Sequence, residues 1–407
     1  MHVIFIEPAF PSNQFQFVRA LHDVGAAVSA IGEAPYDALP GFVKERLTWY
    51  EQVRTVCDLQ SVYQATRRLQ QRGWIDRLEA TVEAHVMVAA EVREKCGIPG
   101  VSLEVTHRCR DKPTMKEVLR KAGIPCAAST GASTPDEVLA FAKEVGFPII
   151  VKPRDGAGAA GAYRIDLPED FDRVMQECGL ASRSFPVAVE EFLSGHEGFF
   201  DTITVDGRVR HEFISHYYPN VLHAMRTRWI SPQIAVTNRV DAPGYRGVRE
   251  LGRRVIEALG IRTAPTHMEW FITPKGLMFS EIACRPPGVG AWDLYNSANE
   301  MDLYAEWARA ICGAPARDFP SRRYAAGHVT LRPDRDGRIV HYRGKDELFR
   351  DLGHLVTESH FPPVGSPTMP IEAGYKANAW IRFKHPDYDV LRDILGRVAE
   401  TVQVYAR

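Results

Sequence analysis

Two glutamates on neighbouring predicted strands constrain this chain more than any other feature of its sequence. Glu269 lies in a segment of strand-like residues, 266–272, and Glu281 lies in a second one, 277–282, with a turn at 274–276 between them. This arrangement predicts a β-hairpin. A carboxylate within an apolar strand is costly unless it is paired or binds a metal. We therefore expect the two glutamates to converge on a divalent cation.

The alternative to a metal site is a solvent-exposed face of an antiparallel sheet, on which a single glutamate is common. On the first strand His267, Glu269 and Phe271 would share one face, and the residues between them would share the other. Two carboxylates on paired strands supply hard oxygen ligands, which Mg²⁺ or Mn²⁺ binds together with substrate phosphates. Arg285 follows Glu281 by four residues and can stabilise a developing anion. The combination predicts a site for phosphate chemistry.

The bulk composition is that of an ordinary globular protein. A formal net charge of −1 over 407 residues argues against a general nucleic-acid surface. No stretch approaches the roughly 18 apolar residues of a membrane helix, and no signal peptide is expected at the start. The seven cysteines are scattered without a C-x-x-C pair, which fits reduced thiols. We expect a cytoplasmic protein that acts on small molecules, with no nucleic-acid or membrane partner.

The order of the predicted elements indicates an α/β fold. A strand over 3–6, a helix over about 14–24 and a strand over 27–31 make a βαβ unit, which implies a parallel sheet. The loop at 7–13 lacks the glycines of a dinucleotide-binding site. Further along the chain, a helix is predicted over residues 75–96. Boundaries near residues 110, 195 and 320 divide the chain into segments 1–110, 111–195, 196–320 and 321–407.

Helices and strands alternate through the rest of the chain. Apolar periodicity and a capping box at Thr134–Glu137 predict helices. The predicted helices cover residues 112–122, 135–145, 169–177, 246–259, 302–311 and 388–402. The predicted strands cover residues 147–151, 163–165, 187–193, 199–205 and 208–213, in addition to the glutamate hairpin.

A glycine-rich loop contains Gly156, Gly158 and Gly161 in the spacing G-x-G-x-x-G. A dinucleotide fingerprint must open a helix, but this loop runs into the strand at 163–165 and therefore predicts a hairpin. Its backbone N–H groups can cover phosphates, and Lys152 upstream is a suitable point charge. The alternative is a plain flexible turn. The nearby lysine makes us favour phosphate binding.

Other polar residues have two interpretations. Lys112 is either a surface lysine or a phosphate ligand. Glu190 and Glu191 lie at the end of an apolar strand, which is either an exposed strand end or an adenine-binding edge. In the second case, a carboxylate would accept a hydrogen bond from the exocyclic amine of adenine, and the backbone of Leu193 would bind the ring. Glu197 is either a solvated acid or an acceptor for ribose hydroxyl groups.

Taken in this order, the motifs resemble the ATP-grasp superfamily, which includes biotin carboxylase, carbamoyl-phosphate synthetase, D-alanine–D-alanine ligase and the L-amino-acid (dipeptide) ligases. The resemblance covers roughly residues 1–315 and is carried by Asp111-Lys112, Phe147–Pro153 with its glycine loop, Val189–Leu193, Glu197, His267-Met-Glu269 and Glu281-x-x-x-Arg285. It implies an ATP-grasp fold with an N-terminal Rossmann-like pre-ATP-grasp domain, a glycine-loop lid subdomain and a small C-terminal α/β tail.

The resemblance also implies roles for single residues. ATP would be bound by Lys112, Lys152, the lid glycines Gly156, Gly158 and Gly161, the adenine-binding residues Glu190, Glu191, Phe192 and Leu193, and the ribose-binding Glu197. Glu269 and Glu281 would ligate Mg²⁺ or Mn²⁺, and Arg285 would act with Lys152 as a catalytic residue. The family usually has asparagine two residues after the second metal glutamate. Ala283 stands there in this chain, so one ligand oxygen is missing.

The implied activity is an ATP-dependent carboxylate–amine ligase that forms an amide or peptide bond through an acyl phosphate and gives ADP and phosphate. The alternatives are a carboxylase or purine-pathway-type ligase that uses bicarbonate or formate, and a non-catalytic nucleotide-binding module. The candidate substrate-binding residues are Arg226, Arg228, His267 and Arg285, although the loop around the first two also fits an ordinary structured loop. Cys284 is expected to be a packed residue. A homodimer is left open, because the N-terminal layer often joins dimer contacts in this superfamily.

Overall fold

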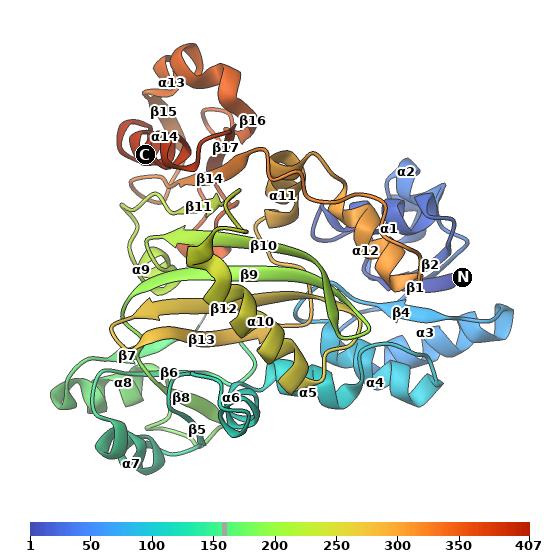
Figure 1. The fold of residues 1–407 in the computed structure, drawn as a ribbon, viewed down its shortest axis with the longest axis horizontal. Coiled ribbons are helices and arrows are strands. Elements are labelled where there is room, and N and C mark those ends of the chain that lie inside the picture. The colour runs from blue at the N-terminus through green and yellow to red at the C-terminus, as the bar shows by residue number, and fades with distance from the viewer. Residues whose placement is uncertain (157–160) are drawn as a thin grey trace.

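The N-terminal layer is a parallel sheet with helices around it. The computed structural model describes residues 1–156 and 161–407, and its first sheet has the strand order β3-β2-β1-β4 (Figure 1). The strands are β1 His2–Ile6, β2 Ala27–Gly32, β3 Trp49–Gln52 and β4 Arg77–Glu79. The predicted βαβ unit is confirmed, because α1 covers Gln14–Asp23 and β1 pairs with β2 in parallel.

The prediction of one helix over residues 75–96 is wrong in its first half. Arg77–Glu79 forms β4, which pairs in parallel with β1, and only Val86–Cys96 is helical, as α4. A segment of three residues is too short to show the alternation of apolar and polar side chains that identifies a strand. Pairing with the distant strand β1 decides the structure of this segment. The other helices of this part are α2 Gly41–Lys44, α3 Leu59–Arg72 and α5 Leu103–Arg110.

A small antiparallel sheet follows α6 (Lys112–Lys121), in the order β5-β8-β6-β7. Its strands are β5 Ser129–Ala132, β6 Ile149–Pro153, β7 Tyr163–Ile165 and β8 Val187–Glu191, and α7 (Pro135–Val145) and α8 (Phe171–Glu177) pack against it. Ile149 pairs with Ile165, so the predicted hairpin around the glycine loop is confirmed. Gly158 lies outside the described residues.

The largest sheet is antiparallel, with the order β13-β12-β9-β10-β11-β14-β17-β16 (Figure 1). Its strands are β9 His196–Val205, β10 Arg208–Tyr218, β11 Gln233–Val236, β12 Ala264–Thr273, β13 Gly276–Ala283, β14 Ala325–Leu331, β16 Val356–His360 and β17 Ala379–His385. The C-terminal strands therefore continue this sheet beyond β11. The remaining elements of the C-terminal segment are β15 Ile339–Arg343, α13 Lys345–Leu352, α14 Tyr388–Thr401 and β18 Gln403–Ala406.

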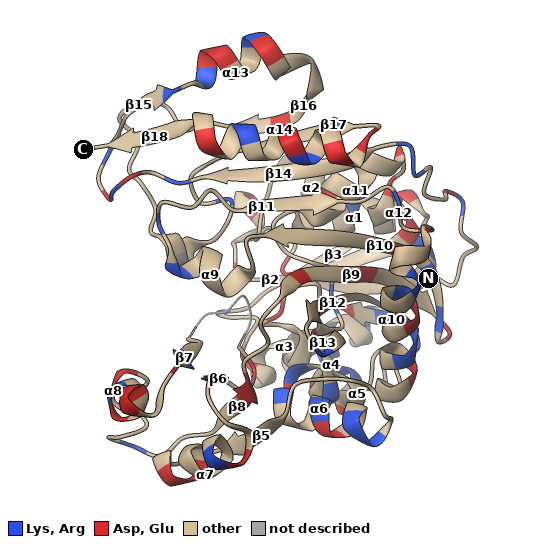
Figure 2. Cartoon of the chain, turned by 60° about the vertical axis from the view of Figure 1, so that its left-hand side comes forward, with Lys and Arg blue, Asp and Glu red and all other residues tan. Residues whose placement is uncertain are grey.

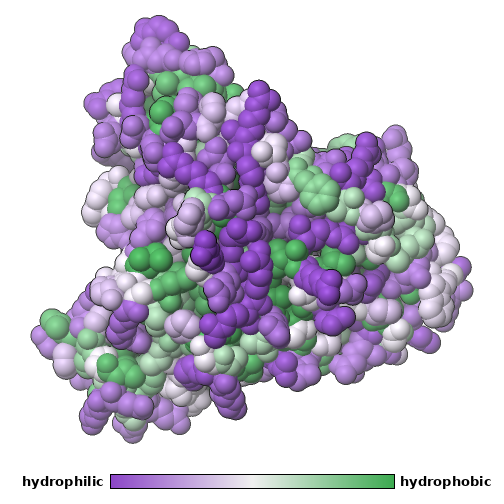
Figure 3. Space-filling model, in the orientation of Figure 1, coloured by the Kyte–Doolittle hydropathy of each residue, from purple (hydrophilic) through white to green (hydrophobic). Residues whose placement is uncertain are grey.

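Helix α10 (Arg246–Leu259) covers one face of the largest sheet (Figure 1). Its buried residues recur at helical spacing, at positions 248, 251, 252, 255, 256 and 259. Gly252 allows the closest approach, because a Cβ atom there would lie 2.3 Å from the ring of Phe200 on β9. The outer side of the helix is hydrophilic in Figure 3, as expected for an amphipathic helix at the surface. The predicted bounds of 246–259 are confirmed.

An aromatic cluster fixes the N-terminal layer to the rest of the molecule. Phe17 of α1 packs against Trp292 of α11 (Ala291–Asn299) and against Tyr304 and Trp307 of α12 (Leu303–Ile311), with ring centroids 4.9–5.4 Å apart. Burial of large aromatic rings is a main source of packing energy. The loop that follows β4 is joined to α1 by the hydrogen bond between Thr81 and Gln14.

Charges of both signs are interspersed over the visible surface (Figure 2), for example along α14. No helix within the described part of the chain is both long enough and apolar enough to cross a membrane.

Candidate active site

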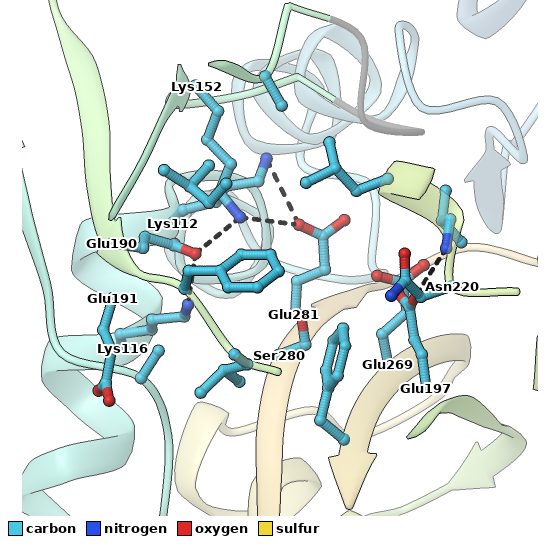
Figure 4. A pocket seen from close by; sticks show the side chains of 18 of the residues that line it. Lys112, Lys116, Lys152, Glu190, Glu191, Glu197, Asn220, Glu269, Ser280 and Glu281 are labelled. Carbon is cyan, nitrogen blue, oxygen red and sulfur yellow. Dashed lines mark hydrogen bonds and ion pairs between the residues drawn. The ribbon is translucent and has the colours of Figure 1, made fainter. Parts of the chain in front are cut away.

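A cleft lies between the small antiparallel sheet and the β9–β12–β13 end of the largest sheet (Figure 4). Its volume is about 880 Å³, including its open side, which is within the usual range for a small-molecule site. It is lined by Lys112, Lys116, Ala127, Ile150, Lys152, Pro153, Gly156, Ala162, Glu190, Glu191, Phe192, Leu193, Glu197, Asn220, Val221, Leu222, Glu269, Phe271, Ser280 and Glu281. Most of the predicted ATP-binding residues and both predicted metal ligands therefore meet in one cleft.

The glutamate hairpin presents its carboxylates to this cleft. Glu269 on β12 lies directly opposite Glu281 on β13. The register then shifts, so that Trp270 pairs with Phe279 and Ser280 is left as a bulge. A bulge re-aims neighbouring side chains, which explains how Ser280 and Glu281, adjacent in sequence, both line the cleft. The predicted hairpin and the convergence of its glutamates are confirmed.

Lysines from two elements surround Glu281. Lys112 begins α6 and Lys152 lies near the end of β6, and their Nζ atoms are 3.8 Å and 3.7 Å from Glu281 Oε2 (Figure 4). Lys152 Nζ also lies 2.8 Å from Glu190 Oε2, which is 2.7 Å from Lys116 Nζ. Glu190 Oε2 is thus held between two lysines, whereas Glu190 Oε1 is buried and has no hydrogen-bond partner among the described residues.

Burial and pairing act against each other in this cluster. Burial would raise the pKa of Glu190, but Lys116 and Lys152 lower it to about 2. Burial lowers the pKa of Lys116. Lys116 pairs with the Glu190 carboxylate, which also pairs with Lys152. Burial also acts to lower the pKa of Lys152, but Glu190 and Glu281 together raise it above its usual value. Lys152 therefore stays protonated at neutral pH and places a positive charge at the cleft.

The start of α6 is anchored to the end of β6. Asp111 caps the helix by accepting from the backbone N–H of Thr114 at 3.0 Å. It also accepts two hydrogen bonds from Arg154, at 2.6 and 2.8 Å. Burial opposes ionisation of Asp111, but these bonds lower its pKa to about 2. The pair fixes the backbone that carries Lys112 next to the backbone that carries Lys152.

Glu197 is a buried acid on β9 that lines the cleft together with the two hairpin glutamates. Its Oε2 accepts from the backbone N–H of Val221 at 2.7 Å. Burial, and then the charge of Glu269, raise the pKa of Glu197 well above its usual value. A neighbouring cation would favour its ionised form.

Arg285 lies in a smaller cavity of about 320 Å³ that shares Lys112, Gly156 and Glu281 with the cleft. Its Nε donates to Glu83, which also binds Arg110. Burial opposes ionisation of Glu83, but the two arginines lower its pKa. Glu83 comes from the loop after β4, so the N-terminal layer contributes directly to the position of Arg285.

His267, on β12 of the glutamate hairpin, lines the same smaller cavity. Its Nδ1 is 2.7 Å from Asp201 Oδ1, and its Nε2 is 3.7 Å from Glu269 Oε1. Asp201 Oδ2 in turn accepts from the hydroxyl of Tyr295 at 2.5 Å. Burial acts against protonation, but Asp201 and Glu269 raise the pKa of His267 to about 9.

Two candidate substrate residues are not among those that line the cleft. Arg226, at the end of α9 (Val221–Arg226), donates to the carbonyl of Ala162 at 2.7 Å. Arg228 forms an ion pair with Asp336 at 2.7 Å. Neither is among the residues that line the cleft, whereas the start of their segment, at Asn220–Leu222, is.

Some residues of the site were not predicted from the sequence. Lys116 follows Lys112 by one helical turn, so helical spacing would have identified it. Ser280 could not be predicted, because it lines the cleft as a result of the bulge. Glu83 and Asp201 reach the site by long-range packing, which leaves no pattern in the local sequence.

The two hairpin glutamates fit a divalent cation that is bound together with substrate. Among the described residues, no group of three or more His, Cys, Asp or Glu side chains could hold a metal ion. Mg²⁺ usually takes one or two carboxylates together with waters and substrate phosphate oxygens. Ala283, which pairs with His267, adds no side-chain oxygen.

Comparisons with known proteins agree with this geometry. A model of the ATP-grasp domain matches residues 117–300. An L-arginine-specific L-amino acid ligase of Bacillus subtilis is 28% identical over 292 residues, which are 70% of this chain and 70% of the relative.

Two solved structures have similar folds. The crystal structure of an L-amino acid ligase from Bacillus licheniformis superposes with a TM-score of 0.77 at 15% identity, over 100% of this chain and 98% of the other. An N5-carboxyaminoimidazole synthetase from Staphylococcus aureus, solved in complex with ADP, gives a TM-score of 0.68 at 14% identity, over 98% and 97%. The expected fold is therefore confirmed: the protein has the ATP-grasp fold and contains an ATP-grasp domain.

Proposed function

We propose that this protein is an ATP-dependent ligase that joins a carboxylate to an amine through an acyl phosphate and releases ADP and phosphate. The observation that carries the proposal is the cleft in which Glu269 and Glu281 face each other beside Lys112 and Lys152. The similarity to a ligase named for L-arginine supports the same class of reaction. The proposed substrates are a small carboxylic acid and a small amine.

ATP is proposed to bind with its phosphates at Lys112 and Lys152, under the loop that contains Gly156 and Gly161. The adenine ring would lie against Ile150 and the strand end at Glu191–Leu193, which line the far part of the cleft. Glu190 is reassigned: its carboxylate is proposed to hold Lys152 in place, because it is already bound to two lysines. Glu197 would receive the ribose hydroxyl groups.

The reaction needs positioning and charge stabilisation from the protein. The substrate carboxylate would attack the γ-phosphate of ATP, and the amine would then displace phosphate from the acyl phosphate. Lys152 stays charged and would stabilise the phosphoryl group in transfer. Arg285, oriented by Glu83, would stabilise the acyl phosphate from the adjoining cavity. Glu269 and Glu281 would hold Mg²⁺ or Mn²⁺, which neutralises phosphate charge.

Replacing Lys152 with methionine is expected to weaken ATP binding about 10- to 100-fold, because a hydrogen bond to a charged group contributes about 1.5–3 kcal/mol. Titration calorimetry with Mg-ATP measures the effect. Lys143→Met on the exposed side of α7 is the matched control and should bind ATP normally. An unchanged affinity in Lys152→Met would remove this lysine from the nucleotide site.

The function is tested by measuring phosphate and ADP release with Mg-ATP. Pairs of amino acids that include L-arginine, single amino acids, and bicarbonate are the test substrates, with mass spectrometry of the products. Release that requires two amino acids, together with a new amide mass, is expected. Release that requires bicarbonate would instead support the carboxylase alternative. ATP binding without release under any condition would support the non-catalytic alternative.

The proposed location is the cytoplasm, because all seven cysteines are free thiols. A homodimer through the N-terminal layer stays a prediction.

A further inference from the structure

Cys109 and Cys284 are in contact behind the candidate active site. Cys109 lies on α5, and Cys284 directly follows β13. Both are free thiols, and their Sγ atoms are 3.1 Å apart. A disulfide requires about 2.05 Å, so the sulfurs need to approach by about one ångström.

Each of these cysteines is followed by an arginine of the site. Arg110 follows Cys109, Arg285 follows Cys284, and both arginines bind the carboxylate of Glu83. The two thiols therefore join the segment of Cys109 to the segment of Cys284. One residue further along each segment, the two arginines join the same segments through Glu83. A covalent bond between the sulfurs would draw these segments together and change the position of Arg285.

Cys284 also lines a second cavity, of about 390 Å³. It is lined in part by Glu79, Arg93 and Trp307. Trp307 is fully buried, and its Nε1 has no hydrogen-bond partner among the described residues. A water-sized molecule with polar atoms would satisfy that donor.

The two thiols differ in the way that an attacking and a resolving cysteine differ. Cys284 is partly exposed, lines the second cavity and interacts electrostatically with the Arg93 guanidinium. An accessible cysteine reacts with oxidants more readily than a buried one. Cys109 is buried, and its hydrogen bond with Cys284 and its burial raise its pKa well above the usual value. Burial raises the pKa of Glu79, which lines the same cavity as Cys284.

We propose that Cys109 and Cys284 form a modification site for hydroperoxides, which convert the two thiols into a disulfide. The Cys284 sulfur attacks the O–O bond, which breaks and gives a sulfenic acid and an alcohol, or water when the oxidant is hydrogen peroxide. The Cys109 sulfur then bonds to the Cys284 sulfur, and the sulfenic oxygen leaves as water. The two thiols lose two electrons and two protons, and one hydroperoxide is reduced.

The disulfide lowers ligase activity because it moves Arg285. This effect on activity rests on the proposed function, whereas formation of the disulfide does not. Cys284 therefore does more than pack against its neighbours, because it is oxidised in the modification. It takes no part in the ligation.

The test treats the reduced full-length protein with hydrogen peroxide. Free thiols are expected to fall from seven to five, with loss of two hydrogen atoms per chain and a cross-linked peptide that contains Cys109 and Cys284. Phosphate release is expected to fall at least tenfold and to recover with dithiothreitol. Thiol counts and peptide masses report the disulfide even if no ligation is found.

Three variants make the test specific. Cys57→Ser, at an exposed cysteine, should still form the disulfide. Cys284→Ser should keep Cys109 unmodified, and Cys109→Ser should stop at a sulfenic acid that dimedone traps at Cys284. A cross-link at other cysteines, or an unmodified pair under conditions that oxidise Cys57, would overturn the proposal. A disulfide without loss of ligase activity would overturn its effect on Arg285.

Discussion

Glu281→Gln is expected to lower turnover at least about 10³-fold, which corresponds to roughly 4 kcal/mol in the barrier. Glu281 lies opposite Glu269 and within 4 Å of both Lys112 and Lys152. Glutamine keeps the shape of the side chain but loses the charge that a divalent cation needs. Phosphate release at saturating substrate measures the effect, and thermal unfolding checks that the variant is folded.

The matched control is Glu257→Gln, at an exposed position on α10 away from the cleft. It should keep normal turnover. Near-normal turnover in Glu281→Gln would show that the hairpin is not the metal site. Loss of ATP hydrolysis in both variants would point to a general effect of lost acidic charge and would contradict the assignment as well.

Glu190→Gln is expected to lower the free energy of unfolding by about 3–5 kcal/mol, the usual cost of breaking a buried ion pair. Among the described residues, Glu190 alone has a carboxylate within 4 Å of the ammonium of Lys116, whose side chain is 1% exposed. The substitution leaves that charge buried without a counterion. Equilibrium urea unfolding measures the loss.

The pH dependence has a definite sign. The pKa of Glu190 is lowered to about 2 in the folded protein, so its contribution is fully present above the ordinary glutamate pKa. The contribution is lost as the pH falls from about 4.5 to 2. Glu190→Gln should therefore show a weaker loss of stability in this range than the unmodified protein.

The neighbouring Glu191→Gln is the matched control. Its partner Lys275 is exposed, so its effect on the free energy of unfolding should stay within about 1 kcal/mol. Adding Lys116→Met to Glu190→Gln should restore part of the stability, because it removes the unpaired ammonium. If Glu190→Gln were as stable as the control, the cluster would not be a buried ion-pair network.

Local patterns predicted the parts of the fold that local forces decide. The amphipathic repeat of α10 gave its bounds, and the hairpin between Glu269 and Glu281 followed from two strand-like segments around a short turn. The helix over 75–96 failed because β4 depends on β1, a partner from the start of the chain. Long-range pairing of a short strand leaves no pattern in the strand itself.

The same division holds for the candidate site. Lys112, Lys152 and Glu281 were predicted from local motifs, and the structure places each lysine ammonium within 4 Å of the Glu281 carboxylate. The role of Glu83 could not be predicted, because its loop reaches Arg285 through long-range contacts, among them the hydrogen bond of Thr81 to Gln14 of α1. The ion pairs of Glu190 with Lys116 and Lys152 could not be predicted, because they join elements that are distant in the sequence.

The unbroken eight-stranded sheet has a consequence for recombination between related enzymes. Strand β11 is completed on one side by β10 and on the other by β14, which lies beyond residue 320. An exchange of everything after that point would have to reproduce the pairing of Gln233–Val236 with residues 326–329, residue for residue. A chimaera that fails to do so would present an open strand edge and aggregate. The C-terminal segment is therefore inherited together with β11 and cannot be exchanged as an independent module.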